Sequence, residues 1–107
     1  MVTRKPQPYK IWMKPAVHAV RRELPGHIRQ QIIRQIDELS TQPRPAQSKQ
    51  LTVPSAIAVG WEVRRIRVSN WRIVYAVSEQ WQEIAILTIQ KRPPYDYQDL
   101  NELLVDL

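Results

Sequence analysis

Among the 16 lysines and arginines and four tyrosines of this 107-residue chain, eight are candidates for binding or cleaving a phosphodiester. Six are cationic and two are phenolic: Lys49, Arg65, Arg67, Arg72, Lys91, Arg92, Tyr95 and Tyr97. Guanidinium and ammonium groups bind phosphate oxygens, and a guanidinium can do so bidentately. A phenol can transfer a proton or stack on a nucleobase. These residue types together indicate a polyanionic ligand.

The distribution of charge supports the same interpretation. The formal net charge is +6, yet residues 96–107 hold four acidic groups and no basic ones. Residues 1–92 therefore carry 16 basic and 6 acidic groups. A basic body suits nucleic acid or a strongly acidic protein partner, and a basic surface that serves only solubility is the alternative.

The central arginines fall in a predicted β-hairpin. Two runs, 64–68 and 71–77, are rich in β-branched and aromatic residues, alternate in polarity, and flank a Ser-Asn pair suited to a tight turn. Because side chains alternate along a strand, we expect Arg65, Arg67 and Arg72 on one face of the sheet.

The other face of the hairpin is expected to be structural. Trp71 and Tyr75 share it with apolar neighbours, which predicts that they lie in the core. Arg64 is expected there in contact with solvent or in a salt bridge to Glu62 or Glu83.

The remaining segments predict an α+β fold in one domain, residues 1–107. Apolar periodicity predicts helices over 15–24 and 28–39 that pack as a two-helix N-terminal hairpin on an antiparallel-dominated sheet of about four strands. Other expected elements are strands over 9–13 and 83–89, an irregular segment over 43–60 with a strand-like piece at 49–53, and a short C-terminal helix over 97–107.

Composition excludes several kinds of chemistry. The chain has no cysteine, so disulfides, thiolate catalysis and cysteine-ligated metal sites are absent. His18 and His27 lie in or beside the predicted helices, far from the basic hairpin, and we expect neither a metal site nor a cofactor. There is no apolar run long enough to span a membrane and no signal peptide, which predicts a cytoplasmic protein without membrane association.

The hairpin also carries a family resemblance. The pattern Arg65-Ile-Arg-Val-Ser-Asn-Trp-Arg-Ile-Val-Tyr75, a following apolar strand, Lys91-Arg92, and then Tyr95 or Tyr97 resemble the RelE/ParE superfamily of small bacterial toxins. The helix pair over 15–40 and Lys49-Gln-Leu51 extend the resemblance more weakly. It implies a RelE-like fold and a toxin of a type II toxin–antitoxin system.

The activity implied by this resemblance is ribosome-dependent cleavage of mRNA without a metal ion. The 2′-hydroxyl attacks the adjacent phosphate and leaves a 2′,3′-cyclic phosphate and a 5′-hydroxyl. This reaction needs a proton acceptor, positive charge at the phosphate and a proton donor for the leaving oxygen. The implied partners are mRNA, the ribosome and a cognate antitoxin protein in a heteromeric complex.

The resemblance also assigns catalytic roles by position. Arg72 would stabilise the transition-state phosphate, and Arg92 would lie near the leaving oxygen. Arg65 and Arg67 stand where a well-known member has lysines, and an arginine does not lose a proton, so neither can be the general base. Tyr97 is expected to act as the general base. The alternative is that its ring stacks on an RNA base.

The remaining three residues are expected to bind RNA. These are Lys49, Lys91 and Tyr95, of which Tyr95 is also an alternative proton-transfer group. Two other functions stay open. One is a ParE-like toxin that inhibits DNA gyrase by binding, without catalysis, and the other is an inactive nucleic-acid-binding homologue.

Overall fold

The computed structural model describes residues 8–91 and residue 104. Its elements are, in order, β1 (Lys10–Met13), α1 (Pro15–Glu23), α2 (Gly26–Leu39), β2 (Ser48–Leu51), α3 (Pro54–Ala58), β3 (Glu62–Val68), β4 (Trp71–Ser78) and β5 (Glu83–Lys91). The strands form one sheet in the order β1-β5-β4-β3-β2. Only β1 runs parallel to its neighbour, and the other pairs are antiparallel.

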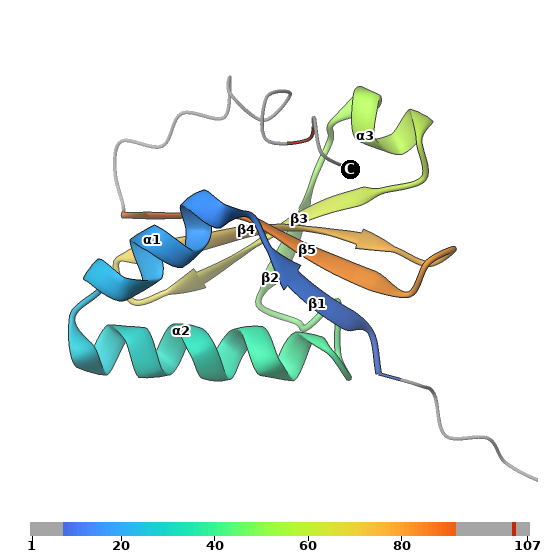
Figure 1. Cartoon of the computed structure of the whole chain (residues 1–107). Helices are drawn as coiled ribbons and strands as arrows, with labels where there is room; N and C mark the ends of the chain where they lie inside the picture. Colours follow the sequence, from blue (N-terminus) through green and yellow to red (C-terminus); the bar gives the residue numbers. More distant parts are fainter. Residues whose placement is uncertain (1–7, 92–103, 105–107) are drawn as a thin grey trace, which may run out of the picture.

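The two long helices cover one face of the sheet, as predicted. Figure 1 shows α2 beneath the sheet and α1 beside it. The apolar stripe of α2 is buried with the inward side chains of β3, β4 and β5 in the larger core cluster. Pro15 occupies the first turn of α1, where its missing N–H breaks no helical hydrogen bond. The helix hairpin therefore fixes which side of each strand points inward.

The hairpin β3–β4 forms as expected around a tight turn. Ser69 at this turn has φ of 54°, a left-handed conformation. Tyr75 is fully buried, and its hydroxyl donates a hydrogen bond of 2.7 Å to the carbonyl oxygen of Pro43. Trp71 is half-buried against the same cluster. The core assignment of Tyr75 is thus confirmed.

The opposite face of the sheet is partly covered by a short helix. The short helix α3 lies on it (Figure 1), and its Ala56 is buried in a second apolar cluster with Val63, Val74, Ala76 and Leu87, among others. Leu104 packs against this cluster as well. Sequence periodicity missed α3 because five residues are too few to define an apolar stripe.

The sheet has five strands rather than about four, because the segments over 10–13 and 48–51 both pair with it. The predicted C-terminal helix over 97–107 lies outside the described residues except for Leu104. Within the part of the chain that is described, no helix is long and apolar enough to cross a membrane.

Candidate nucleic-acid interface

Four cations meet on the sheet face opposite the long helices. Strand pairing places Lys49 of β2 directly opposite Arg65 of β3, and Arg67 of β3 directly opposite Arg72 of β4. Residues opposite each other in an antiparallel pair project from the same face. That face also carries Val63 and the second apolar cluster. We call Lys49, Arg65, Arg67 and Arg72 the cationic face.

This arrangement lowers the stability of the sheet, and the hairpin sequence alone does not reveal it. Like charges directly opposite each other on neighbouring strands destabilise a sheet. The cationic face contains two such pairs side by side, Lys49 with Arg65 and Arg67 with Arg72. A sheet that places cations in register twice concentrates positive potential, which favours a polyanionic ligand.

The four cations differ in accessibility. Lys49 and Arg67 are exposed and Arg65 is half-buried, whereas Arg72 is only 5% exposed. The sequence predicts the shared face of Arg72 with Arg65 and Arg67, which the register confirms, but it does not predict this burial. Arg72 is the second residue of β4 and shares a face with Val74 and Ala76 of the second apolar cluster. An arginine in such a place can pack its aliphatic stem while its guanidinium stays charged.

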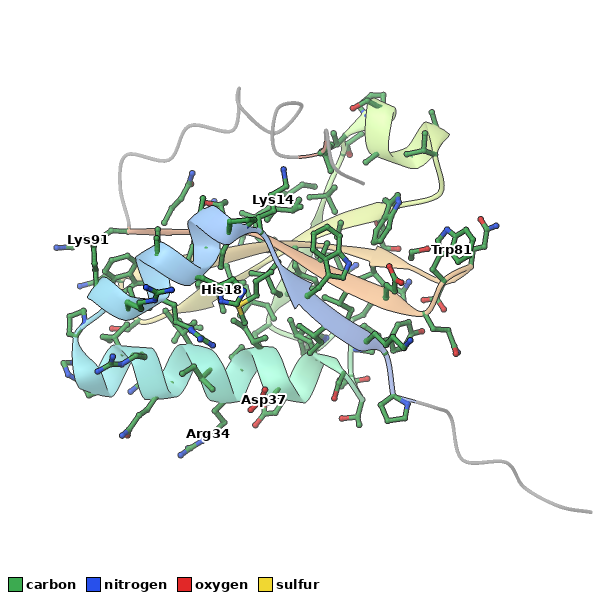
Figure 2. All side chains as sticks on the ribbon, viewed as in Figure 1. Lys14, His18, Arg34, Asp37, Trp81 and Lys91 are labelled. Atoms are coloured by element: carbon green, nitrogen blue, oxygen red, sulfur yellow. The ribbon has the colours of Figure 1, made fainter. Side chains whose placement is uncertain are left out.

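Other predicted site residues do not join this face. Lys91 is exposed but pairs with Trp71, which packs on the helical side of the sheet. Figure 2 shows Lys91 at the end of β5, far along the sheet from Trp81. Arg92, Tyr95 and Tyr97 lie outside the described residues.

One residue on the cationic side was missed by the sequence reasoning. Gln90 of β5 lies directly opposite Arg72. Its Oε1 atom is shielded from solvent and has no hydrogen-bond partner within residues 8–91 or Leu104. The pairing of Arg72 with Gln90 follows from the register of β4 and β5, which a local motif does not define.

The arginines at the other end of the hairpin have carboxylate partners. Arg44 donates from Nε to Glu62 at 3.0 Å and from Nη2 to Glu79 at 2.7 Å. Arg64 donates from Nη1 to the same Glu62 oxygen at 2.8 Å, one of the two bridges predicted for it. Tyr9 donates its hydroxyl to Glu79 at 2.7 Å. We call these five residues the carboxylate network.

The pKa values within the network reflect these contacts. Burial alone would raise the pKa of Glu62, but hydrogen bonds from Arg64 and Arg44 lower it below its ordinary value. Hydrogen bonds from Tyr9 and Arg44 lower the pKa of Glu79. The pKa of Tyr9 is raised in turn, mainly by its hydrogen bond to Glu79. The network therefore stabilises the ionised carboxylates.

Two surface hollows are lined by described residues outside the cationic face. One of about 590 Å³ runs along the outer side of α2, lined in part by Arg34 and Asp37. Another of about 280 Å³ borders the carboxylate network between Arg44, Ile57 and Glu79. Neither is lined by a residue of the cationic face.

Histidine and metal chemistry receive no support from the described residues. His18 lies on α1, on the helical side of the sheet (Figure 2), and His27 is exposed at the start of α2. Within the described ranges, no three histidine or acidic side chains group as metal ligands would.

The architecture matches solved toxin structures. The RelE–RelB complex from the archaeon Pyrococcus horikoshii aligns with a TM-score of 0.72 and 20% identity, covering 82% of this chain and 99% of that chain. The RelBE2 toxin–antitoxin complex from Mycobacterium tuberculosis gives 0.64 and 21%, covering 79% and 99%. The isolated RelE toxin from E. coli gives 0.62 and 18%, covering 91% and 99%. The fold is therefore RelE-like.

The sequence defines the family directly. Residues 12–92 match the family described as the ParE toxin of the type II toxin–antitoxin system parDE. The match spans all five strands apart from the start of β1, and it covers well over half of the chain. The chain belongs to this family of toxins. No curated protein matches the sequence.

Proposed function

We propose that this toxin is an endoribonuclease that cleaves mRNA on the ribosome and binds the RNA backbone through its cationic face. The observation that carries the proposal is the double in-register pairing of cations, Lys49 with Arg65 and Arg67 with Arg72. Four cations gathered on one face of the sheet favour a ligand with several negative charges. An RNA backbone supplies closely spaced phosphates of that kind.

The proposed chemistry is transesterification within the RNA. The 2′-oxygen attacks the adjacent phosphorus and loses its proton, the bond from phosphorus to the 5′-oxygen breaks, and the 5′-oxygen takes up a proton. Arg72 would stabilise the charge that develops on the phosphate oxygens, while Arg65 and Arg67 bind neighbouring phosphates. Because Arg72 is 5% exposed, its guanidinium must turn outward to reach the phosphate.

Proton transfer would need a group other than an arginine. The arginines of this face cannot act as the base, since a guanidinium stays charged. Lys49 is exposed and faces Arg65 across β2 and β3, and we propose it as an RNA-binding residue. We retain Arg92, Tyr95 and Tyr97 as proposed RNA-contacting or proton-transferring residues, and Lys91 as an RNA contact outside the cationic face.

We further propose that a cognate antitoxin binds this toxin in a heteromeric complex. Two of the similar solved structures, those from Pyrococcus horikoshii and Mycobacterium tuberculosis, are complexes of a toxin with its antitoxin. An acidic segment of the antitoxin would cover the cationic face and prevent RNA from reaching it.

Primer extension on a reporter mRNA in a cell-free translation system tests the nuclease. We expect wild-type protein to produce cuts only when ribosomes translate the mRNA, and Arg72→Ala to reduce the cleavage rate by about 100-fold, as the loss of one transition-state donor does. Arg34→Ala is the matched control, because Arg34 points away from the sheet beneath α2 (Figure 2). Intact mRNA with wild-type protein would contradict the proposal.

The family match and the burial of Arg72 support a second candidate, inhibition of DNA gyrase by binding. A toxin that only binds needs no outward movement of Arg72 and no proton acceptor. A supercoiling assay with purified gyrase separates the two functions. Loss of supercoiling together with intact mRNA would favour gyrase inhibition, and cut mRNA with unchanged supercoiling would favour the nuclease.

A further inference from the structure

A second group of cations lies where α1 ends and α2 begins. The segment over 21–29 holds three arginines and one acidic residue, Glu23. Arg21 and Arg22 occupy the last turn of α1, and Arg29 occupies the first turn of α2. Only two residues join the two helices, so the three arginines start from one end of the molecule (Figure 1).

Lys91 adds a fourth cation on the helical side of the sheet. It ends β5, the strand against which α1 packs. It also lies opposite Trp71, which packs against the larger core cluster on that side, and opposite residues project from the same face. Figure 2 shows Lys91 at the end of the sheet away from Trp81. We call Arg21, Arg22, Arg29 and Lys91 the junction surface.

The charges of the junction surface are accessible to a ligand. Three of its side chains are exposed, and that of Arg21 is half-buried. The salt bridges within residues 8–91 and Leu104 belong to the carboxylate network, and none includes a cation of the junction surface. The guanidinium of Arg29 folds back over the start of α2, with Nη2 4.0 Å from the position that a Cβ on Gly26 would take. Its charge therefore lies close to the link between the helices.

Helix stability explains only part of this arrangement. Cations near the C-terminal end of a helix interact favourably with its dipole, which accounts for Arg21 and Arg22 in α1. In α2 the order is reversed, because Arg29 lies in the first turn whereas Asp37 and Glu38 lie in the last. The helix α2 thus adds positive charge at the junction and negative charge at its far end.

The composition of the junction surface favours a phosphate backbone over unpaired bases. Proteins that bind single strands combine cations with aromatic rings on which the bases stack. Among the described residues, the exposed large apolar side chains are Ile57, Val59 and Trp81, which lie on α3 and beyond β4 rather than at the helix junction. Cations without a stacking ring suit a double helix, whose bases are paired and whose phosphates are exposed.

We propose that the junction surface binds the phosphate backbone of double-helical RNA. The choice of RNA over DNA rests on the proposed function. The cationic face lies on the other side of the sheet, so the two surfaces contact different phosphates. The junction surface holds the toxin beside a paired region, while the cationic face reaches a single-stranded one. Lys91 belongs to the first of these contacts.

The salt dependence of binding to a short, blunt-ended RNA duplex tests this proposal. Affinity is measured by fluorescence anisotropy with the full chain. In the double variant Arg22→Gln/Arg29→Gln, the slope of log K against log salt should fall by about 0.9 for each lost phosphate contact, as for double-helical DNA. Lys10→Gln/Arg34→Gln is the matched control. It also removes two exposed cations, but outside the junction surface, and should leave the slope unchanged.

Single-stranded RNA provides the converse test. The double variant Arg22→Gln/Arg29→Gln should bind an unstructured single strand as the wild type does, because the cationic face is intact. Arg67→Ala should lose affinity for the single strand and keep its affinity for the duplex. Loss of both ligands in both variants would overturn the division of the two surfaces.

Charge reversal separates a binding role of Arg29 from a structural one. Arg29→Glu places a carboxylate in the first turn of α2, where the helix dipole favours negative charge, so the urea midpoint of unfolding should rise. Its affinity for the RNA duplex should fall further than that of Arg29→Gln. A lower urea midpoint with unchanged duplex affinity would show that Arg29 supports the fold and would overturn its place in the junction surface.

The outcomes distinguish this proposal from the nuclease. Wild-type protein that binds no RNA duplex would overturn it, as would equal salt slopes for the wild type and Arg22→Gln/Arg29→Gln or an equal reduction in the control. Tighter binding to a DNA duplex of the same sequence would overturn the choice of RNA. Intact mRNA in the translation assay, combined with the expected loss of duplex binding, would reject the nuclease and leave the junction surface in place.

Discussion

The two ends of the β3–β4 hairpin use arginine in opposite ways. At one end Arg44 and Arg64 donate hydrogen bonds to Glu62, and Arg44 also reaches Glu79. At the other end Arg67 lies opposite Arg72 in register. The first arrangement joins the segment after α2 to the sheet, whereas the second concentrates positive charge.

This difference shows that the charge of the neighbouring side chains separates the two groups of arginines. A carboxylate partner satisfies the guanidinium and converts it into a structural link. A cation directly opposite an arginine adds a second positive charge at that place, which costs stability. We therefore expect substitutions in the carboxylate network to reduce stability, and substitutions on the cationic face to preserve it or increase it.

The largest change in stability is expected for Glu62→Gln. Glu62 accepts hydrogen bonds from two arginines, and its side chain is 26% exposed. Removing the charge should lower the free energy of unfolding by about 1–2 kcal/mol, measured by urea denaturation. Glu79→Gln is the control: that side chain is 57% exposed, so its loss should stay below about 1 kcal/mol. Equal effects would contradict the assignment of Glu62 as the centre of the network.

The same network predicts how stability depends on pH. Folding lowers the pKa of Glu62 and of Glu79 below the ordinary value of 4.5, so the unfolded chain binds more protons in acid. Their contribution is complete above that ordinary value and is lost as the pH falls through the lower folded values. The urea midpoint should fall in this range, and the fall should be shallower in Glu62→Gln. An identical pH profile in both proteins would contradict the role of Glu62.

Tyr75→Phe should have an effect of about 1 kcal/mol. The change deletes a hydroxyl of a fully buried side chain that donates to the carbonyl oxygen of Pro43. Pro43 directly precedes Arg44, which contacts both glutamates of the carboxylate network. Urea denaturation measures the loss. Tyr9→Phe is a suitable control, because the hydroxyl of Tyr9 bonds to Glu79 at an exposed position. A larger loss for Tyr9→Phe would mean that the segment after α2 is not held through Tyr75.

The smallest effect, and one of opposite sign, is expected for Lys49→Gln. This change removes the like-charge pair of Lys49 with Arg65 while keeping a polar, exposed side chain. The free energy of unfolding should increase by about 0.2–0.5 kcal/mol at low ionic strength, and the gain should shrink as salt is added. A loss of stability would mean that the pairing of these two cations does not weaken the sheet.

Much of this fold could be predicted from local patterns. The helix over 28–39, the hairpin and the placement of Arg65, Arg67 and Arg72 on one face follow from periods of 3.6 and 2 residues, which each segment carries within itself. The salt bridge of Arg64 with Glu62 is one of three alternatives that the sequence left open, the others being Glu83 and solvent.

What could not be predicted depends on contacts between distant segments. The register of β2 against β3 creates the pair Lys49 and Arg65, and the register of β5 against β4 brings Gln90 opposite Arg72. Arg44 stands in a proline-punctuated segment with no periodicity, so nothing local placed it between Glu62 and Glu79. The burial of Arg72 depends on the second apolar cluster, which includes the unpredicted α3.

The salt dependence of RNA binding tests the central claim most directly. We would measure the affinity of wild type, Arg67→Ala and Arg44→Ala for a short single-stranded RNA across a range of salt concentrations. Loss of one phosphate contact should reduce the slope of log K against log salt by about 0.7 in Arg67→Ala and leave it unchanged in Arg44→Ala. Equal slopes for Arg67→Ala and wild type, or an equal reduction in both variants, would contradict the division between the cationic face and the carboxylate network.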